Sequence, residues 1–295
     1  MSADAWQEVR QELAIWQASG QTVRIWFRDD DAIRVTPALH QLESLARKHG
    51  LQIGLAVIPG PAQTELVDYL HAHDSSFHPM CHGWMHEIHQ SIEFGEFGAG
   101  RPQQALRVDA IRALKQVQRL VGKRYPTFVP PFGRLDDTFI PELMRIGFAG
   151  VSNKPTLRQV RLARLHASFP RLPQGVAWLT PPPGLLDAHI DPIDWKQSTA
   201  LSEPHIARQL VGELRLRRKR YSRTDAPIGI LTHHLVHDDA VWARLSTLMD
   251  ILASSPAVAF QAASDLAMEC ETAIHRRAAV PRSMKHTWRD VVPYD

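Results

Sequence analysis

Histidine side chains crowd the segment MCHGWMHEIHQ, which spans residues 80–90. His82 and His86 are four positions apart, and His89 follows them. In a helical turn that spacing places both imidazoles on one side, where they can share one metal ion. An HxxxH pattern alone is weakly specific, because histidines are common in loops. With one carboxylate added, it becomes a ligand set typical of Zn²⁺ and other transition metals, with positions left open for water and substrate.

A candidate carboxylate follows the apolar run TVRIWF, residues 22–27, where the chain reads Asp29, Asp30 and Asp31. Three adjacent carboxylates repel one another unless a cation or an arginine neutralises them. A single aspartate at this place is often just a helix N-cap. Three in a row, directly after a strand, favour a functional site.

Further polar groups come at the ends of later predicted strands. The segment PPFG covers residues 130–133, DPIDW covers residues 191–195, and the apolar strand GILT runs directly into His233 and His234. Active sites of parallel α/β folds lie at the carboxyl ends of the strands. These groups are therefore expected to meet the aspartates and histidines on one rim.

The elements that position this rim alternate between apolar strands and amphipathic helices, which predicts a parallel sheet covered by helices. Six to eight such units can close into a barrel. We expect one domain over residues 1–295, with a core at about residues 22–275 and a helix at residues 5–18 packed outside. Between residues 154 and 194 the Pro-rich chain predicts loops with short strands, and the tail after residue 279 has no strong pattern.

Composition narrows the function classes. The net charge is +3, too small to indicate a nucleic-acid partner. The basic run at residues 215–223 fits a solvated helix face. Two cysteines form no disulfide framework and suit a reducing compartment. The first residues lack the apolar core of a secretory signal, and no apolar run is long enough to span a membrane. These features predict a cytoplasmic protein.

Together the motifs resemble those of the polysaccharide deacetylase family, carbohydrate esterase family 4, also called NodB-like. FRDDDA corresponds to the first motif, HGWMH to the second, VPPFG in part to the third, DPIDW to the fourth and IGILTHH to the fifth. The similarity covers roughly residues 24–255. It implies an α/β fold, a deformed (β/α) barrel of about seven parallel strands with helices outside, and hydrolysis of the N-acetyl group of an amino sugar by a bound divalent metal.

The resemblance also implies roles for the aspartates and histidines. One aspartate of the first motif is a metal ligand, and the aspartate before it is the general base. The extra aspartate permits two registers: Asp29 as base with Asp30 as ligand, which we prefer, or Asp30 as base with Asp31 as ligand. His82 and His86 complete the metal set, and His89 is a neighbour.

The other implied roles belong to the later motifs. His233 is the expected general acid and His234 the fallback, since adjacent strand residues point to opposite faces. Asp194 corresponds to the carboxylate that orients the acid. Trp195 corresponds to an apolar wall for the acetyl methyl group. Pro131 and Phe132 are expected at the substrate, with the Phe132 N–H holding the oxyanion.

The sequence departs from the family at the third motif. The family has an arginine that orients the base where this chain has Val129, and either Arg28 or Arg134 is a candidate substitute. The departure motivates two alternatives to a metal-dependent deacetylase of an N-acylated sugar or sugar conjugate. One is a barrel that binds a carbohydrate without catalysis, and the other is a metal-independent hydrolase of a small C–N compound. Zinc is the expected ion, with Co²⁺, Ni²⁺ or Fe²⁺ compatible with the same ligands. The residues leave the oligomeric state open.

Overall fold

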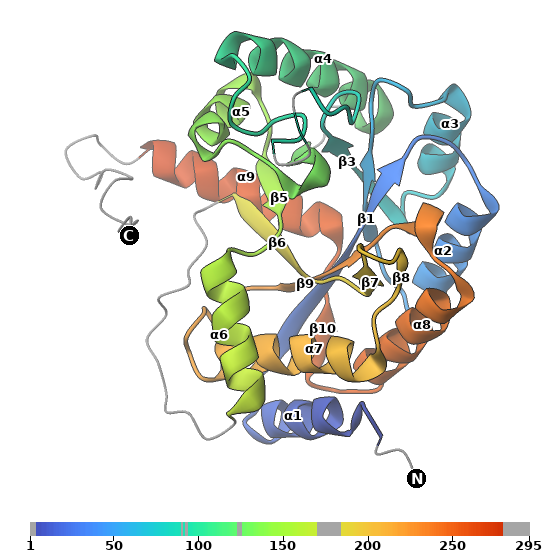
Figure 1. Cartoon of the computed structure of the whole chain (residues 1–295), viewed down its shortest axis with the longest axis vertical. Coiled ribbons are helices and arrows are strands. Elements are labelled where there is room, and N and C mark those ends of the chain that lie inside the picture. Colours follow the sequence, from blue (N-terminus) through green and yellow to red (C-terminus); the bar gives the residue numbers. More distant parts are fainter. Residues whose placement is uncertain (1–3, 90, 92–93, 123–125, 170–183, 280–295) are drawn as a thin grey trace.

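Seven parallel strands close into a ring in the computed structural model, which describes residues 4–89, 91, 94–122, 126–169 and 184–279 (Figure 1). Neighbouring strands pair in the order β1, β2, β3, β4, β5, β6 and β9, and β1 pairs with β9 to complete the ring. The predicted barrel is thus confirmed. The strands are β1 (Val23–Ala32), β2 (Ile53–Val57), β3 (Phe77–His82), β4 (Thr127–Val129), β5 (Gly150–Asn153), β6 (Leu185–Ile190) and β9 (Ile228–Thr232).

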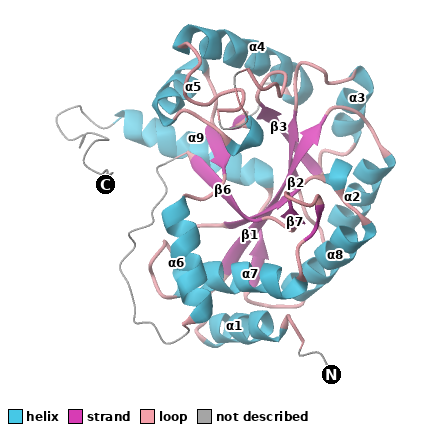
Figure 2. Ribbon diagram, viewed as in Figure 1, coloured by secondary structure: helices cyan, strands magenta, loops and turns pink. Residues whose placement is uncertain are grey.

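Helices surround the ring (Figure 2). They are α1 (Gln7–Ala18), α2 (Pro37–Lys48), α3 (Thr64–Ala72), α4 (Gln103–Val121), α5 (Ile140–Ile146), α6 (Leu157–Ser168), α7 (Glu203–Arg218), α8 (Asp239–Ala253) and α9 (Ala263–Ala279). The helix predicted at residues 5–18 is confirmed as α1, which packs on α7. In the described part of the chain, no helix is both long and apolar enough to cross a bilayer.

Two buried layers follow from the alternation of strand side chains. On β1, Ile25 and Phe27 join the large core between the strands and the outer helices. Trp26 points the other way and packs with Met80 and Leu186 inside the barrel. Leu266 and Cys270 of α9 belong to the same inner cluster, so apolar side chains fill the end of the barrel opposite the rim.

Two smaller strand features complete the fold. The short strand β10 (Val258–Phe260) pairs with the first residues of β1. The hairpin of β7 (Ile193–Asp194) and β8 (Thr199–Ala200) follows β6. The region expected to hold only loops and short strands also contains a full helix, α6, whose N-cap Thr156 accepts a hydrogen bond from the Gln159 N–H. The tail after residue 279, in which the sequence shows no strong pattern, lies outside the described residues.

Candidate metal and catalytic site

Three side chains from two strand ends converge on the rim of the barrel. His82 Nε2 lies 3.1 Å from Asp31 Oδ1, and His86 Nε2 lies 3.4 Å from the same oxygen. The three potential ligand atoms all lie within 4.8 Å of one another. Asp31 Oδ1 is buried between the two imidazoles. Two imidazole nitrogens and a carboxylate oxygen so placed fit a transition-metal ion.

The histidine tautomer needed for such binding is set by the backbone. His82 Nδ1 lies 3.1 Å from the carbonyl oxygen of Val129. An Nδ1–H donated to that carbonyl leaves Nε2 as a lone-pair donor directed toward Asp31. The position where the family carries an arginine therefore contributes its main-chain oxygen to the site.

The loop that carries the two histidines is organised by Glu96, a residue that the sequence analysis did not identify. Its carboxylate accepts hydrogen bonds from the N–H groups of Trp84, Met85 and His86 at 3.1, 2.8 and 3.2 Å. A Cβ at Gly83 would lie 2.3 Å from Glu96 Oε2, so glycine is needed for this close approach. An isolated acid in a loop carries no periodic signal, so only the fold reveals its role.

Of the three aspartates, Asp31 lies with the two histidines, whereas we preferred Asp30 as the metal ligand. The strand alternation breaks here, because the pairing of β1 with β2 shifts between Asp29 and Ala32 and Asp31 has a φ of +74°. That left-handed conformation turns the Asp31 side chain to the rim, which a regular strand would not do.

Asp30 lies beside the histidines' cluster and is held by an arginine of its own strand. Arg28 Nε lies 2.9 Å from Asp30 Oδ1, and Arg28 NH2 donates to Asp30 Oδ2 at 3.0 Å. Arg28 NH1 also donates to Ser152 Oγ at 2.7 Å, and both charged side chains are buried. Of the two candidate substitutes for the third-motif arginine, the structure brings Arg28 to this aspartate. Residues two apart on a strand share a face, which explains the pairing.

Asp29 faces away from that pair and is fully buried. His234 Nδ1 lies 2.5 Å from Asp29 Oδ1, and Asp29 Oδ2 accepts from the His234 N–H and from Thr232 Oγ1 at 2.9 and 2.7 Å. The structure thus brings our preferred base into contact with the fallback acid. His233 instead points to Asp30, with 3.9 Å between His233 Nε2 and Asp30 Oδ2.

The residues of the fourth motif lie on the hairpin next to His233. The Trp195 ring meets the His233 ring edge-on at 4.5 Å between centroids, and it remains 46% exposed. Asp194 Oδ1 accepts from the Lys196 N–H, and no described hydrogen bond or ion pair joins Asp194 to His233. Asp191, which we did not assign a role, accepts a hydrogen bond from Trp195 Nε1 at 2.7 Å. It therefore orients the Trp195 ring.

The third-motif residues lie on the opposite side of the histidines. The Phe132 ring packs at 4.2 Å from the His86 ring, and Pro131 is buried in the turn Pro131–Gly133. Phe132 has a φ of +60° and His86 a φ of +59°. With Asp31, three residues of one site hold conformations that side chains other than glycine rarely adopt. Such strain is typical of sites whose geometry the surrounding fold imposes.

The pKa values of the three residues in the cluster shift in different directions. Burial raises the pKa of Asp31, but the hydrogen bond and the charge of His82 lower it by more. The net pKa therefore falls below the ordinary value. Burial lowers the pKa of His82, and the carboxylates of Asp30 and Asp31 outweigh it and raise the net pKa. The pKa of His86 is lowered, first by burial and then by the neighbouring His82. A neutral His86 is the form that binds a metal ion.

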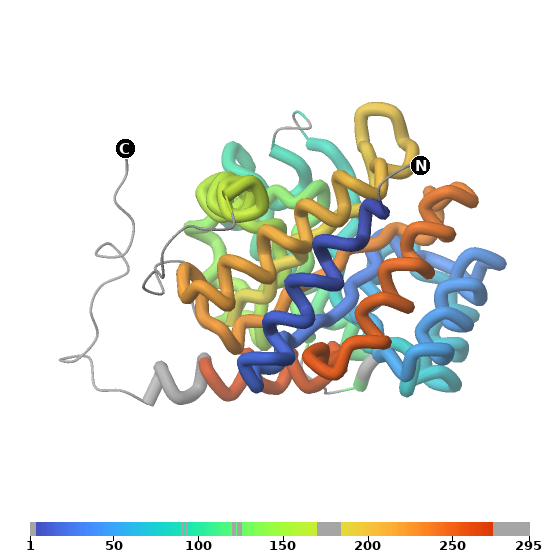
Figure 3. Tube along the Cα trace, turned by 90° about the horizontal axis from the view of Figure 1, so that it is seen from below, coloured from blue at the N-terminus to red at the C-terminus, as the bar shows by residue number. Residues whose placement is uncertain are grey.

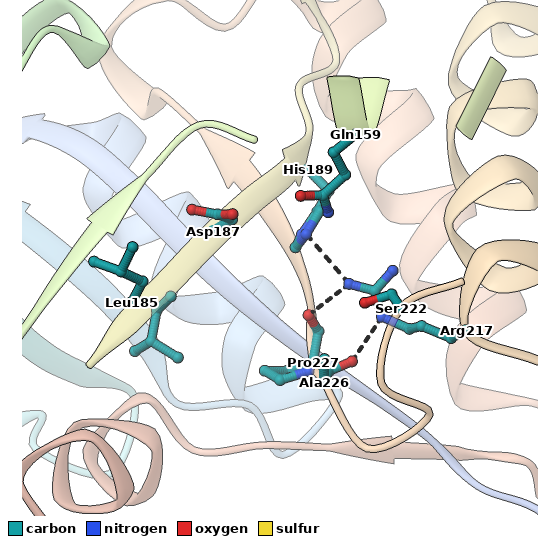
Figure 4. Close-up of a pocket in the computed structure, with 9 residues that line it drawn as sticks. Gln159, Leu185, Asp187, His189, Arg217, Ser222, Ala226 and Pro227 are labelled. Atoms are coloured by element: carbon teal, nitrogen blue, oxygen red, sulfur yellow. Dashed lines mark hydrogen bonds between the residues drawn. The ribbon is translucent and has the colours of Figure 1, made fainter. Parts of the chain in front are cut away.

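A second polar cluster lies away from the rim, between β6, α6 and the end of α7 (Figure 4). Arg217 donates to the carbonyls of Ala226 and Pro227 at 2.6 and 3.0 Å, and its NH2 lies 3.2 Å from His189 Nε2. These bonds tie the end of α7 to the loop that leads into β9. Asp187 lines the same small cavity.

Comparison with known proteins reveals similar folds only. No family model and no curated protein sequence matches the chain. Among solved structures, a polysaccharide deacetylase from Bacillus cereus is 16% identical with a TM-score of 0.46, and the match covers 82% of this chain and 92% of that one. A family 4 acetyl xylan esterase from Clostridium thermocellum, in complex with a cobalt ion, is 11% identical with a TM-score of 0.47, covering 82% and 89%.

Pseudoenzymes occur among the similar structures as well. A CE4 family pseudoenzyme from Bacillus anthracis is 13% identical with a TM-score of 0.45, covering 84% of this chain and 66% of that one. At this level of similarity the comparison does not extend to activity, which is argued from the site of this chain.

Proposed function

We propose that the protein is a metal-dependent hydrolase that removes the N-acetyl or a related N-acyl group from an amino sugar or sugar conjugate. The observation that carries the proposal is the rim cluster: Asp31, His82 and His86 in metal-binding geometry, with Asp30 and His233 beside them. Amide hydrolysis requires an activated water, a general base and a general acid. A metal-ligand set next to one carboxylate and one histidine can supply all three.

The roles follow from position. A divalent ion held by Asp31, His82 and His86 would lower the pKa of a water molecule and polarise the acyl carbonyl. Asp30 accepts the proton of the attacking water as general base. Arg28 holds both Asp30 oxygens in place, so that the carboxylate keeps one orientation throughout. Zinc is the proposed ion, since its common ligands match the set.

His233 completes the reaction as general acid. When the C–N bond breaks, a proton on His233 passes to the leaving amine nitrogen, and the acyl group departs as a carboxylic acid. Trp195 covers His233 and forms an apolar wall for the acyl methyl group. We assign the Phe132 N–H to the oxyanion. Asp194 is a neighbour of this site, because its carboxylate caps the adjacent hairpin turn.

A metal-content measurement on the purified protein, followed by deacetylation of N-acetylglucosamine oligomers, tests the proposal. Wild-type protein should hold about one ion per chain and release acetate. His82→Ala should lose both properties, whereas His89→Ala, in the same loop and exposed, should keep both. Wild-type protein that binds no metal after incubation with Zn²⁺ or Co²⁺ contradicts the proposal.

The second candidate is a barrel that binds a carbohydrate without catalysis, motivated by Val129 at the third-motif position. The Arg28–Asp30 contact argues against it, because an arginine reaches the base from another direction. Metal binding and sugar binding without release of acetate from any N-acetylated sugar would favour this candidate.

A further inference from the structure

Helix α6 presents an outward face of unusual composition. Its large apolar side chains Leu157, Leu165 and Phe169, the last just past the helix end, are 75%, 43% and 58% exposed. Between them on the same face lie three exposed arginines, Arg158, Arg161 and Arg164. At 100° per residue these six side chains share one side of the helix.

These arginines have no acidic partner. No hydrogen bond or ion pair of Arg158, Arg161 or Arg164 is found in the described part of the chain. Arginines on other helices differ, since Arg215 and Arg218 both reach Glu12 and Arg107 reaches Glu142. Among the residues that the structure describes, the positive charge of α6 is therefore uncompensated.

The sequence around α6 points the same way. Between Glu142 and Asp187 the chain contains no Asp or Glu, although 31 acidic residues occur in the chain as a whole. Six lysines and arginines fall in that interval: Arg145, Lys154, Arg158, Arg161, Arg164 and Arg171. A basic segment with large apolar residues and no acids is typical of a peripheral membrane-binding surface.

The opposite face of α6 anchors it to the barrel. Gln159, Ala163, His166 and Ala167 are buried. A Cβ on Gly212 of α7 would lie 2.4 Å from the Ala163 carbonyl oxygen, so the two helices are in close contact. Figure 3 shows α6 end-on, on the same side of the molecule as the β7–β8 hairpin. The exposed face is thus carried by a rigidly packed helix.

We propose that this face of α6, together with Phe169, binds the surface of an anionic lipid bilayer. The arginines meet the lipid phosphates, and the three apolar side chains enter the boundary between headgroups and acyl chains. Apolar side chains between the cations favour a bilayer over a nucleic acid, whose backbone would leave them in water. The proposal concerns attachment and does not depend on the proposed catalysis.

Sedimentation with vesicles tests it, using phosphatidylcholine alone and a mixture of phosphatidylcholine and phosphatidylglycerol. The wild-type protein should bind the mixed vesicles and release from them in high salt. Replacing Arg158, Arg161 and Arg164 by Gln should weaken binding about 100-fold, since each basic residue strengthens attachment about fivefold. The matched control replaces Arg107, Arg112 and Arg119 of α4 by Gln, with the same change in net charge, and should bind nearly as wild type.

Further variants separate the contributions. The double variant Leu157→Ser/Phe169→Ser should weaken vesicle binding while all three arginines remain. Circular dichroism should show that this variant and the α6 triple arginine variant are both folded. The metal-site variant His82→Ala should bind vesicles normally, which keeps the result independent of catalysis. Equal losses in the α4 and α6 triple variants, no preference for the anionic vesicles, or binding of a DNA duplex without binding of vesicles would each overturn the proposal.

Discussion

Two aspartate–histidine pairs lie side by side where β1 meets β9, and their surroundings are opposite. In the first, Asp29 and His234 are sealed from solvent, and the Asp29 carboxylate accepts hydrogen bonds from three donor groups. In the second, Asp30 and His233 are 3.9 Å apart, and His233 Nδ1 is buried without a hydrogen-bond partner. The second pair borders the metal ligands, whereas the first lies behind it.

The difference distinguishes a pair that holds the barrel together from a pair that can react. Asp29 is sealed from solvent and already accepts three hydrogen bonds, so a substrate proton cannot readily reach it and it is a poor general base. Its pKa is lowered even though burial raises it, because the charge and hydrogen bond of His234 outweigh desolvation. Asp30 owes its orientation to Arg28, and His233 lies 3.9 Å from its carboxylate. Adjacent residues of identical type thus acquire different roles from the strand alternation alone.

The largest effect should come from the ligand that places the metal beside the second pair. Asp31→Ala removes the only carboxylate of the metal-binding cluster, and deacetylation should fall by at least about 10⁴-fold with loss of the bound ion. Elemental analysis and acetate release on the same sample measure both. Asp31→Ala protein that keeps its metal and its activity would place the centre elsewhere.

Breaking the Asp29–His234 pair should lower the stability of the fold. His234→Gln leaves the Asp29 charge buried without its main partner, and the free energy of unfolding should fall by about 3 to 5 kcal/mol. Urea titration followed by circular dichroism measures the loss. If His234→Gln instead abolishes turnover while the urea midpoint stays unchanged, the two histidines have exchanged the roles assigned to them.

The Asp30–His233 pair should respond in the opposite way. His233→Gln removes the general acid, so kcat should fall by about 10²-fold or more, while the urea midpoint stays close to that of the wild type because no ion pair of normal length is broken. Steady-state kinetics and denaturation together give the comparison. An unchanged kcat would remove His233 from the reaction.

Asp187 is a third aspartate, outside the two pairs, whose ionisation can be compared with theirs. Burial and the nearby Glu213 raise the pKa of Asp187 to about 6. The folded protein therefore keeps a proton there that the unfolded chain releases from about pH 4 upward, and stability falls as the pH rises toward 6. Asp187→Asn cannot ionise, so above pH 6 it should be more stable than the wild type by about 2 kcal/mol, with no difference below pH 4.

Thermal melts across that pH range check this smallest effect. Figure 4 shows Asp187 on β6, near the cluster of Arg217 and His189. A gain for Asp187→Asn that persists unchanged below pH 4 would have a cause other than ionisation.

The sequence predicted the barrel because each strand is apolar and each helix amphipathic, and these patterns depend only on local spacing. It also predicted that the aspartates and histidines of these motifs meet on one rim, since parallel strands all end on the same side. The sequence could not predict which aspartate lies with the two histidines, because the positive φ of Asp31 breaks the alternation that a sequence pattern assumes.

Two contacts account for the other differences. Arg28 meets Asp30 from two residues away on β1, and the sequence left Arg28 and Arg134 as equal candidates for such a contact. Glu96 holds the histidine loop across several residues of irregular chain, and that contact leaves no periodic trace. Helix α6 was missed for another reason: prolines flank it, and its exposed Leu157, Leu165 and Phe169 hide the usual contrast between an apolar and a polar face.

The pairing of β1 with β9 has a consequence for the order in which function arises. β1 and β9 are separated by about 200 residues, so their contact has a high contact order and its loop-closure entropy must be overcome late in folding. Asp31, His82 and His86 all belong to the first third of the chain, but His233 arrives only with β9. A nascent chain on the ribosome therefore contains all three residues of the proposed metal site long before it contains His233, the proposed acid. The proposed reaction thus requires closure of the ring.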